Sequence, residues 1–309
     1  MMGIPEQGLA LEASGLGKRF GSTWALRDCG LSVPEGHVVA LVGPNGSGKT
    51  TLLHLAVGLA TPTTGRVRVQ GGLAAGSLEA LERVAFVAQD TALYPSLSVA
   101  DMLHLARNLN ADFDSARAEA RIAELDIPSA RKVGKLSGGQ RAQVALTLAL
   151  AKRPRLLILD EPLSSLDPLA RHDFMAALMT AVAEDGISVI FSSHVVSELE
   201  RVCDYLVVLA SGRVQVAGEV DDLLTSHQLY TGPAAQADRL AAALPVVRDR
   251  RAEAQAHLLV RTGGRRAEVP TGWEAHEVGL EEMVLAYLRD PGASALPGPR
   301  ELTGKGARP

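Results

Sequence analysis

The segment Gly43–Thr50, which reads GPNGSGKT, constrains this chain more than any other. It matches the pattern GxxxxGK[ST] of a phosphate-binding loop at every fixed position. The apolar run His37–Val42 precedes it and the helical pattern Thr51–Leu59 follows it. A strand before the loop and a helix after it are the context that the motif requires. We therefore predict a phosphate site on an α/β fold.

Each part of this loop has an expected role. The glycines let consecutive backbone amides turn toward phosphate oxygens, and the following helix presents its positive end to the same anion. Lys49 is expected to bind the β- and γ-phosphates, and the Thr50 hydroxyl to bind Mg²⁺. The expected nucleotide-binding residues of the loop are Gly43, Pro44, Asn45, Gly46, Ser47, Gly48, Lys49, Thr50 and Thr51. The loop alone does not decide between a kinase, a GTPase, a motor and a transporter ATPase.

Polar residues follow two further apolar runs. Leu156–Leu159 is followed by Asp160 and Glu161, and Ile187–Phe191 is followed by two serines and His194. Ligands of open α/β sheets lie beyond the carboxyl ends of the strands, so these side chains should meet at the phosphates. We predict that Asp160 holds Mg²⁺ through water, that Glu161 accepts a proton from the attacking water, and that His194 contacts the γ-phosphate. The alternatives are a solvated turn for the acids and a structural role for the histidine.

Bulk properties exclude several classes of protein. The 309 residues suit one large domain with an accessory region, or two modest domains. The net charge of -4 gives no general attraction for nucleic acid, so no nucleic-acid partner is expected. Cys29 and Cys203 lie far apart without a CxxC pair, which argues against a disulfide framework or a zinc site. The N-terminus lacks the pattern of a signal peptide, and no apolar run approaches the roughly 20 residues of a membrane span. A cytoplasmic protein is expected.

The strand and helix patterns divide the chain. Short apolar runs alternate with helical patterns, which predicts a largely parallel sheet. Residues 97–150 instead predict three helices, with a capping box at Ser98–Asp101, a cap at Asp114 and a third start near Ser137. Charged residues of this insertion should form a solvated face; they include Arg117, Glu119 and Arg121.

The pattern weakens after residue 228. Residues 229–289 predict a small C-terminal region with an alanine-rich stretch, a hairpin around Gly263-Gly264 and a helix at Leu280–Leu288. The tail 290–309 has too little apolar content to pack and is predicted to be disordered.

A second anion site is predicted at Leu136–Gln140, which reads LSGGQ and precedes the helical run Arg141–Ala151. Its serine and glycines form an exposed helix N-terminus. One phosphate loop has no local need for a second site. The economical interpretation is that Ser137, Gly138, Gly139 and Gln140 cap the ATP of another subunit, so that two copies face head to tail.

The order GPNGSGKT, LSGGQ, LLILDEP and SSH resembles the ATP-binding cassette (ABC) family over about residues 8–228. This resemblance implies a P-loop NTPase cassette with a mostly parallel core sheet, an antiparallel β part, a helical insertion at about 97–150 and a small C-terminal region. It implies ATP and Mg²⁺ as ligands. It also implies that Gln89 touches Mg²⁺ and the attacking water and that Phe20 stacks on adenine.

The resemblance extends to partners. Ser164–Asp167 resembles the loop that crosses the dimer interface, with Asp167 near the partner's ATP, and Asp90–Val99 would receive a membrane permease. The chain departs from the family at Gln143 and Leu148, where arginines are frequent, which puts the contacts of that helix in doubt.

The expected function is ATP binding and hydrolysis that powers a separate integral-membrane permease. The sequence from LSGGQ to DEP and the segment LEEMVLAYL most resemble those of bacterial drug- or antibiotic-export cassettes. The resemblance also implies a second ATP-binding subunit, in a homodimer or a heterodimer. It further implies a peripheral position on the inner face of the cell membrane. The alternative is a soluble ABC-type ATPase acting on nucleic acid or ribosomes, against which stand the single cassette and the absence of heptads and zinc spacing. A kinase or GTPase would not need LSGGQ.

Overall fold

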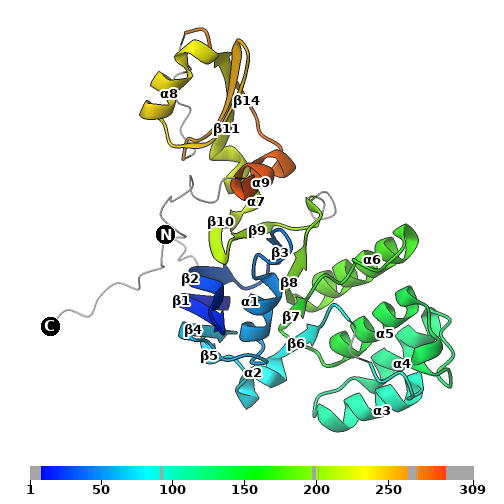
Figure 1. Cartoon of the computed structure of the whole chain (residues 1–309). Coiled ribbons are helices and arrows are strands. Elements are labelled where there is room, and N and C mark those ends of the chain that lie inside the picture. Colours follow the sequence, from blue (N-terminus) through cyan, green and yellow to red (C-terminus); the bar gives the residue numbers. More distant parts are fainter. Residues whose placement is uncertain are drawn as a thin grey trace, which may run out of the picture.

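A computed structural model describes residues 8–90, 93–196, 200, 202–263, 269 and 271–289. Its centre is a six-stranded sheet in the order β10-β9-β3-β8-β7-β6 (Figure 1). Neighbouring strands from β9 to β6 are parallel, and β10 is antiparallel to β9. The strands are β3 (Val38–Val42), β6 (Val84–Val87), β7 (Leu156–Leu159), β8 (Ser188–Ser193), β9 (Tyr205–Ala210) and β10 (Arg213–Glu219).

Both faces of this sheet are buried, which explains its unbroken apolar runs. In β7, Leu157 and Leu159 belong to one hydrophobic cluster and Leu156 and Ile158 to the other. The first cluster includes residues of α5 (Gly138–Ala151) and α6 (Pro168–Asp185). The second includes residues of α1 (Lys49–Ala56) and of an antiparallel sheet in the order β2-β1-β4-β5. The predicted α/β class with an antiparallel part is confirmed.

The antiparallel sheet is built on a long hairpin of β1 (Leu9–Phe20) and β2 (Thr23–Pro34), with β4 (Thr64–Val69) and β5 (Leu73–Ala74) beside it. The sequence analysis expected an antiparallel part but did not predict this hairpin. The helix expected to reach Leu59 ends at Ala56, and Gly58 has a φ of 78°. A short helix, α2 (Leu78–Arg83), leads into β6.

The helical insertion forms as predicted, and Figure 1 shows it gathered at one end of the cassette. It consists of α3 (Val99–Leu109), α4 (Ser115–Glu124), the short η1 (Val133–Lys135) and α5. Ser98 and Asp101 form the predicted capping box, and the Asp114 side chain accepts the Arg117 amide. At α6, Asp167 caps the start and Gly186 ends the helix with a φ of 63°.

The C-terminal region is a four-stranded antiparallel sheet in the order β12-β13-β11-β14. Its elements are α7 (Val220–Thr225), β11 (His227–Pro233), η3 (Ala234–Gln236), α8 (Ala237–Ala243), β12 (Val246–Ala252), β13 (Gln255–Arg261), β14 (Glu274–His276) and α9 (Leu280–Arg289). The hairpin expected at Gly263-Gly264 is wrong. Gly264 lies outside the described residues, but the strands on either side of it, β13 and β14, are separated by β11. The hairpin lies between β12 and β13 instead.

Helix α9 joins this region to the cassette. Met283, Val284 and Tyr287 share one hydrophobic cluster with Leu206 and Val208 of the central sheet. The predicted disordered tail, 290–309, lies outside the described residues. None of the described helices combines the length and the apolar composition that a membrane span requires.

Candidate active site

The phosphate loop connects β3 to α1 with a backbone that only glycine tolerates at two positions. Gly48 has a φ of 106°, and a β-carbon there would lie 2.6 Å from the Ala25 carbonyl oxygen. A β-carbon at Gly43 would lie 2.2 Å from the Leu209 carbonyl oxygen. Helix α1 begins at Lys49 without a side-chain cap, so its first amides are directed into the loop. This is the geometry of an anion-binding helix N-terminus.

The strand register brings the predicted residues to one edge of the sheet. Val42 pairs with Ser193, and Leu159 pairs with both Val87 and Phe191. The residues that follow these pairs therefore leave the sheet side by side. Gly43 and His194 come directly after these pairs, and Gln89 and Glu161 come two residues after them.

Three of the predicted side chains form a continuous chain of contacts. The Lys49 Nζ lies 3.3 Å from Glu161 Oε1, and Glu161 Oε2 lies 3.3 Å from His194 Nδ1. Lys49 also donates a hydrogen bond of 2.8 Å to the Gly43 carbonyl. Lys49 is buried, whereas the His194 side chain is 46% exposed. A cation for phosphate, a carboxylate able to accept a proton and a half-exposed imidazole thus lie within one site.

Asp160 and Glu161 are linked through Ser192, a residue to which the sequence analysis gave no role. The Ser192 hydroxyl donates to Asp160 Oδ1 at 2.6 Å and accepts from the Glu161 amide at 2.8 Å. Asp160 is 2% exposed and Ser192 0%. The signal that could have found Ser192 is a polar residue at the end of an otherwise apolar strand.

The donor set suits a Mg²⁺ ion, whose preferred ligands are oxygens. Ser192 occupies only one Asp160 oxygen, and the Thr50 hydroxyl is exposed at the start of α1. The described residues contain no cluster of three or more His, Cys, Asp or Glu side chains able to hold a metal. A Mg²⁺ ion here would therefore complete its coordination with substrate oxygens and water, as it commonly does.

Two of the predicted residues are exposed and lie at, or just beyond, the end of a strand. Phe20 ends β1, is 57% exposed, and has the Lys18 Nζ 5.1 Å from its ring centroid. Its open ring face is available for stacking. Gln89 is exposed two residues beyond β6.

The LSGGQ segment forms the N-terminus of α5. The Ser137 hydroxyl accepts the Gln140 amide at 3.1 Å, and Gln140 Oε1 accepts the Ser137 amide at 3.1 Å. Ser137 is exposed. Among the residues that the structure describes, no hydrogen bond or ion pair joins this segment to the phosphate loop.

The segment lies against the start of α6. A β-carbon at Gly139 would lie 2.9 Å from the Ala170 Cβ, which explains the need for glycine there. The Asp167 side chain accepts the Leu169 and Ala170 amides. Asp167 therefore caps its own helix, and its expected role toward a partner's ATP stays a prediction.

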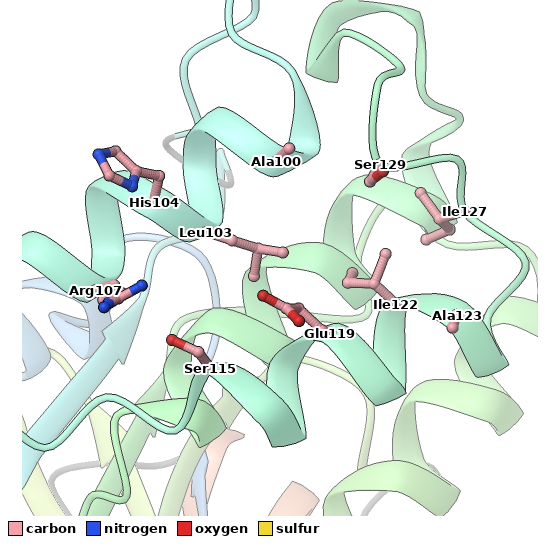
Figure 2. Close-up of a pocket in the computed structure, with 10 residues that line it drawn as sticks. All are labelled: Ala100, Leu103, His104, Arg107, Ser115, Glu119, Ile122, Ala123, Ile127 and Ser129. Atoms are coloured by element: carbon pink, nitrogen blue, oxygen red, sulfur yellow. The ribbon is translucent and has the colours of Figure 1, made fainter.

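Helix α3 separates two hollows. One face of α3, with Met102, Leu105 and Leu109, lines an apolar groove that continues along β6 to Tyr94 and Leu148. The opposite face lines a hollow of about 450 Å³ between α3 and α4. Figure 2 shows this second hollow, with His104 and Arg107 on α3, Glu119 on α4, and Leu103 and Ile122 between them. It contains no residue of the phosphate site.

The departures from the family pattern have a structural outcome. Arg121 of α4 donates to Gln143 Oε1 at 2.7 Å and to Thr147 Oγ1 at 3.1 Å. The prediction that Arg121 belongs to a solvated face is therefore wrong, because it is partly buried between α4 and α5. Leu148, in place of an arginine, lines the apolar groove.

Comparison with known proteins agrees with this geometry. A family model described as "ABC transporter" matches residues 26–164, and a model of an AAA domain (putative AbiEii toxin, Type IV TA system) matches 129–200. The uncharacterized ABC transporter ATP-binding protein YdbJ of Bacillus subtilis is 33% identical over 208 residues, which are 66% of this chain and 68% of that protein. This chain belongs to the ABC transporter ATP-binding family.

Two further relatives of this ABC protein have named cargo. The Fe(3+) ions import ATP-binding protein FbpC of Pseudomonas fluorescens is 39% identical over 220 residues, covering 68% of this chain and 61% of FbpC. The spermidine/putrescine import ATP-binding protein PotA of Methylococcus capsulatus is 37% identical over 211 residues, covering 67% of this chain and 55% of PotA. The ABC chain thus spans little more than half the length of these relatives. Both names describe import, so they do not confirm the expected likeness to export cassettes.

Solved structures support the fold. An ATP-binding subunit of an ABC transporter is 30% identical with a TM-score of 0.63, covering 69% of this chain and 91% of that one. The dimeric structure of MJ0796, a bacterial ABC transporter cassette, is 26% identical with a TM-score of 0.60, covering 68% and 98%. The P-loop cassette fold predicted from the sequence is confirmed.

Proposed function

We propose that this ABC chain binds ATP with Mg²⁺ and hydrolyses it to drive a membrane permease. The observation that carries the proposal is the contact chain from Lys49 through Glu161 to His194 at the carboxyl edge of the sheet. Lys49 binds the β- and γ-phosphates, Glu161 accepts a proton from the attacking water, and His194 orients that water against the γ-phosphate. Hydrolysis of a phosphoanhydride needs a proton acceptor close to the cationic side chain that binds the phosphates, and Glu161 lies beside Lys49 in this way.

Mg²⁺, when bound, neutralises the charge that develops on the phosphates. Asp160, Thr50 and Gln89 are the chain's own residues that would hold it, directly or through water. The remaining loop residues, Gly43, Pro44, Asn45, Gly46, Ser47, Gly48 and Thr51, supply amides and hydroxyls. The Ser47 hydroxyl is buried with no hydrogen-bond partner among the described residues. Because buried polar groups are normally hydrogen-bonded, this hydroxyl is available to bind a ligand.

A second ATP-binding subunit completes the site. Ser137 to Gln140 form an exposed, capped helix start that makes no hydrogen bond or ion pair with the phosphate loop of the described chain. A partner placed head to tail would bring this anion site to the ATP held by Gly43–Thr50. The dimer of MJ0796 supports this arrangement.

The apolar groove beside Gln89 is the proposed docking surface for the permease. It is lined by apolar side chains of three elements, and Tyr94 and Leu109 are strongly exposed on it. Exposed apolar surface of this kind marks interaction sites. The groove overlaps the segment Asp90–Val99 that the sequence predicted as the receiving surface, of which residues 91 and 92 lie outside the described part. Docking there places the chain at the inner face of the membrane.

The transport direction is set by the permease. Export was expected from the sequence, whereas FbpC and PotA are named as import proteins and favour import. The alternative function, an ABC-type ATPase acting on nucleic acid or ribosomes, has no support among these relatives. Identification of the membrane protein that co-purifies with the chain decides the direction.

The hydrolytic role is tested with Glu161→Gln, which keeps the shape of the side chain but removes the proton acceptor. Because general base catalysis contributes typically 10²–10⁴-fold, turnover should fall by about that factor while ATP binding is retained. Glu82→Gln, at an exposed position of α2, is the matched control and should keep wild-type turnover. Undiminished hydrolysis by Glu161→Gln would overturn the assignment.

The docking role is tested separately with Leu109→Glu, which places a charge on the apolar groove. Co-purification with the permease should be lost while ATP binding by the isolated chain is unchanged. Val269→Glu charges an exposed apolar residue of the C-terminal region and should leave co-purification intact. Equal loss in both variants would contradict the groove as the docking surface.

A further inference from the structure

We infer that Ser192 is a positioning residue that sets the geometry of the Mg²⁺-binding acid and of the catalytic base together. The inference rests on the proposed ATPase function and deepens it, because it concerns the same site. Its basis is one buried hydroxyl that bonds to both acids.

The first bond orients Glu161. The parallel pairing of β7 with β8 ends at Leu159 and Phe191, so the Glu161 amide has no acceptor in the strand ladder. The Ser192 Oγ takes that place at 2.8 Å. Glu161 has a φ of 45°, in the left-handed region that non-glycine residues rarely adopt. Such a conformation persists only where surrounding contacts hold it, and the Ser192 bond is one contact that does so.

The second bond orients Asp160. The Ser192 hydroxyl carries a single proton, which it donates to Asp160 Oδ1 at 2.6 Å. This short distance is typical of a charge-assisted hydrogen bond. Because the proton is committed to Asp160, only lone pairs are left to face the Glu161 amide. The two bonds therefore support each other, and they leave the other Asp160 oxygen for the metal.

The consequence is that the base cannot move independently of the metal ligand. With this left-handed backbone, the Glu161 carboxylate contacts both Lys49 and His194. If the backbone of Glu161 returned to a more common conformation, its carboxylate would move away from both. Without the hydroxyl, the Glu161 amide loses its acceptor in a buried site. Asp160 at the same time loses the donor that fixes its rotation. A purely structural serine would affect stability alone.

The chain contains a matched control on the same strand. Ser188 is also buried, and its Oγ also accepts a backbone amide, that of Gly36, at 2.9 Å. It lies at the amino end of β8, away from the site. Ser192→Ala and Ser188→Ala therefore each remove one buried hydroxyl that accepts a hydrogen bond from one backbone amide.

The experiment compares these two variants in the full chain. Ser192→Ala should lower kcat by about tenfold or more, as expected for the loss of a hydrogen bond to a charged group, with little change in KM. It should also weaken Mn²⁺ binding in the presence of a non-hydrolysable ATP analogue, measured by electron paramagnetic resonance. Ser188→Ala should lower Tm by a similar amount and change neither kcat nor Mn²⁺ affinity.

A second variant covers the case in which Ser192→Ala does not fold. Ser192→Cys fills a similar volume with a weaker donor and acceptor, and it should lose kcat in the same direction. Unchanged kcat in the cysteine variant, or equal losses of kcat in Ser192→Ala and Ser188→Ala, would overturn the inference. Unchanged Mn²⁺ affinity in Ser192→Ala would do the same. If the wild type hydrolyses no ATP, the proposed function fails, and the Mn²⁺ comparison still tests Ser192.

Discussion

Replacing Ser137 by alanine separates its local role from its proposed role toward a partner. In the chain, its hydroxyl oxygen accepts the Gln140 amide, and this bond is lost in Ser137→Ala. The reciprocal bond, from the Ser137 amide to Gln140, uses the backbone and remains. Because the cap uses a lone pair of the hydroxyl, its proton is free to be donated to a phosphate oxygen of the partner's ATP.

Both losses have an expected size. Removal of a serine N-cap costs about 1 kcal/mol of stability, which lowers Tm by roughly 2–4 °C in a chain of a few hundred residues. Loss of a hydrogen bond to a charged phosphate costs about 1.5–3 kcal/mol, which corresponds to roughly a 10- to 150-fold fall in turnover.

Ser77→Ala is the matched control, because Ser77 caps α2 by accepting the Ala80 amide at 3.2 Å. Both variants should lose comparable stability in thermal denaturation. Only Ser137→Ala should lose ATP turnover in a steady-state phosphate-release assay. Equal turnover in the two variants would refute a role for Ser137 beyond its own helix.

Two further predictions concern the exposed Phe20 and the buried His227. Phe20→Ala should raise the Kd for ATP about tenfold, as expected for the loss of one stacking contact of about 1–3 kcal/mol. Phe20→Tyr keeps the aromatic ring and should keep the wild-type Kd. Unchanged affinity in the alanine variant, measured with a fluorescent ATP analogue, would contradict adenine stacking. Burial lowers the pKa of His227, whose Nδ1 lies 2.6 Å from the Leu223 carbonyl and whose Nε2 lies 2.7 Å from the Tyr287 hydroxyl. As the pH falls, His227 therefore binds a proton in the unfolded chain before it does so in the folded chain. The stability of the folded chain should be unaffected above the unfolded pKa of about 6.5 and should decrease below it. The decrease in Tm between roughly pH 7 and 5 should be smaller in His227→Gln, and an equal decrease would contradict the role of His227.

The sequence predicted the parts of the fold whose signals are local. The bounds of β7 agree with the predicted run Leu156–Leu159, because buried parallel strands carry unbroken apolar residues. The capping box at Ser98 and the Asp114 cap were predictable because each joins residues three positions apart in the sequence. The long β1–β2 hairpin was missed, because irregularities interrupt its strand pairing and burial along β1 does not alternate regularly. Neither strand therefore shows the clean period of two that identifies a strand in a sequence. The C-terminal sheet was misjudged because β11 lies between β13 and β14, a pairing that no local pattern records.

The residues of the site that belong to recognisable sequence motifs were predictable. Lys49, Glu161 and His194 meet as expected, because the ends of parallel strands share one edge. Ser192 was not predicted, since its role depends on the register between β7 and β8. Arg121 was misassigned because its partners, Gln143 and Thr147, belong to another helix.

The central claim is that one chain binds ATP and two chains complete the site. Sedimentation of Glu161→Gln with and without ATP and Mg²⁺ tests it most directly, because slow turnover preserves the bound nucleotide. The account predicts a monomer without ATP, a dimer with ATP, and a monomer again when Ser137→Arg is added to Glu161→Gln, although this double variant still binds ATP. A chain that stays monomeric with saturating ATP, or a dimer that forms equally well with Ser137→Arg, would contradict it.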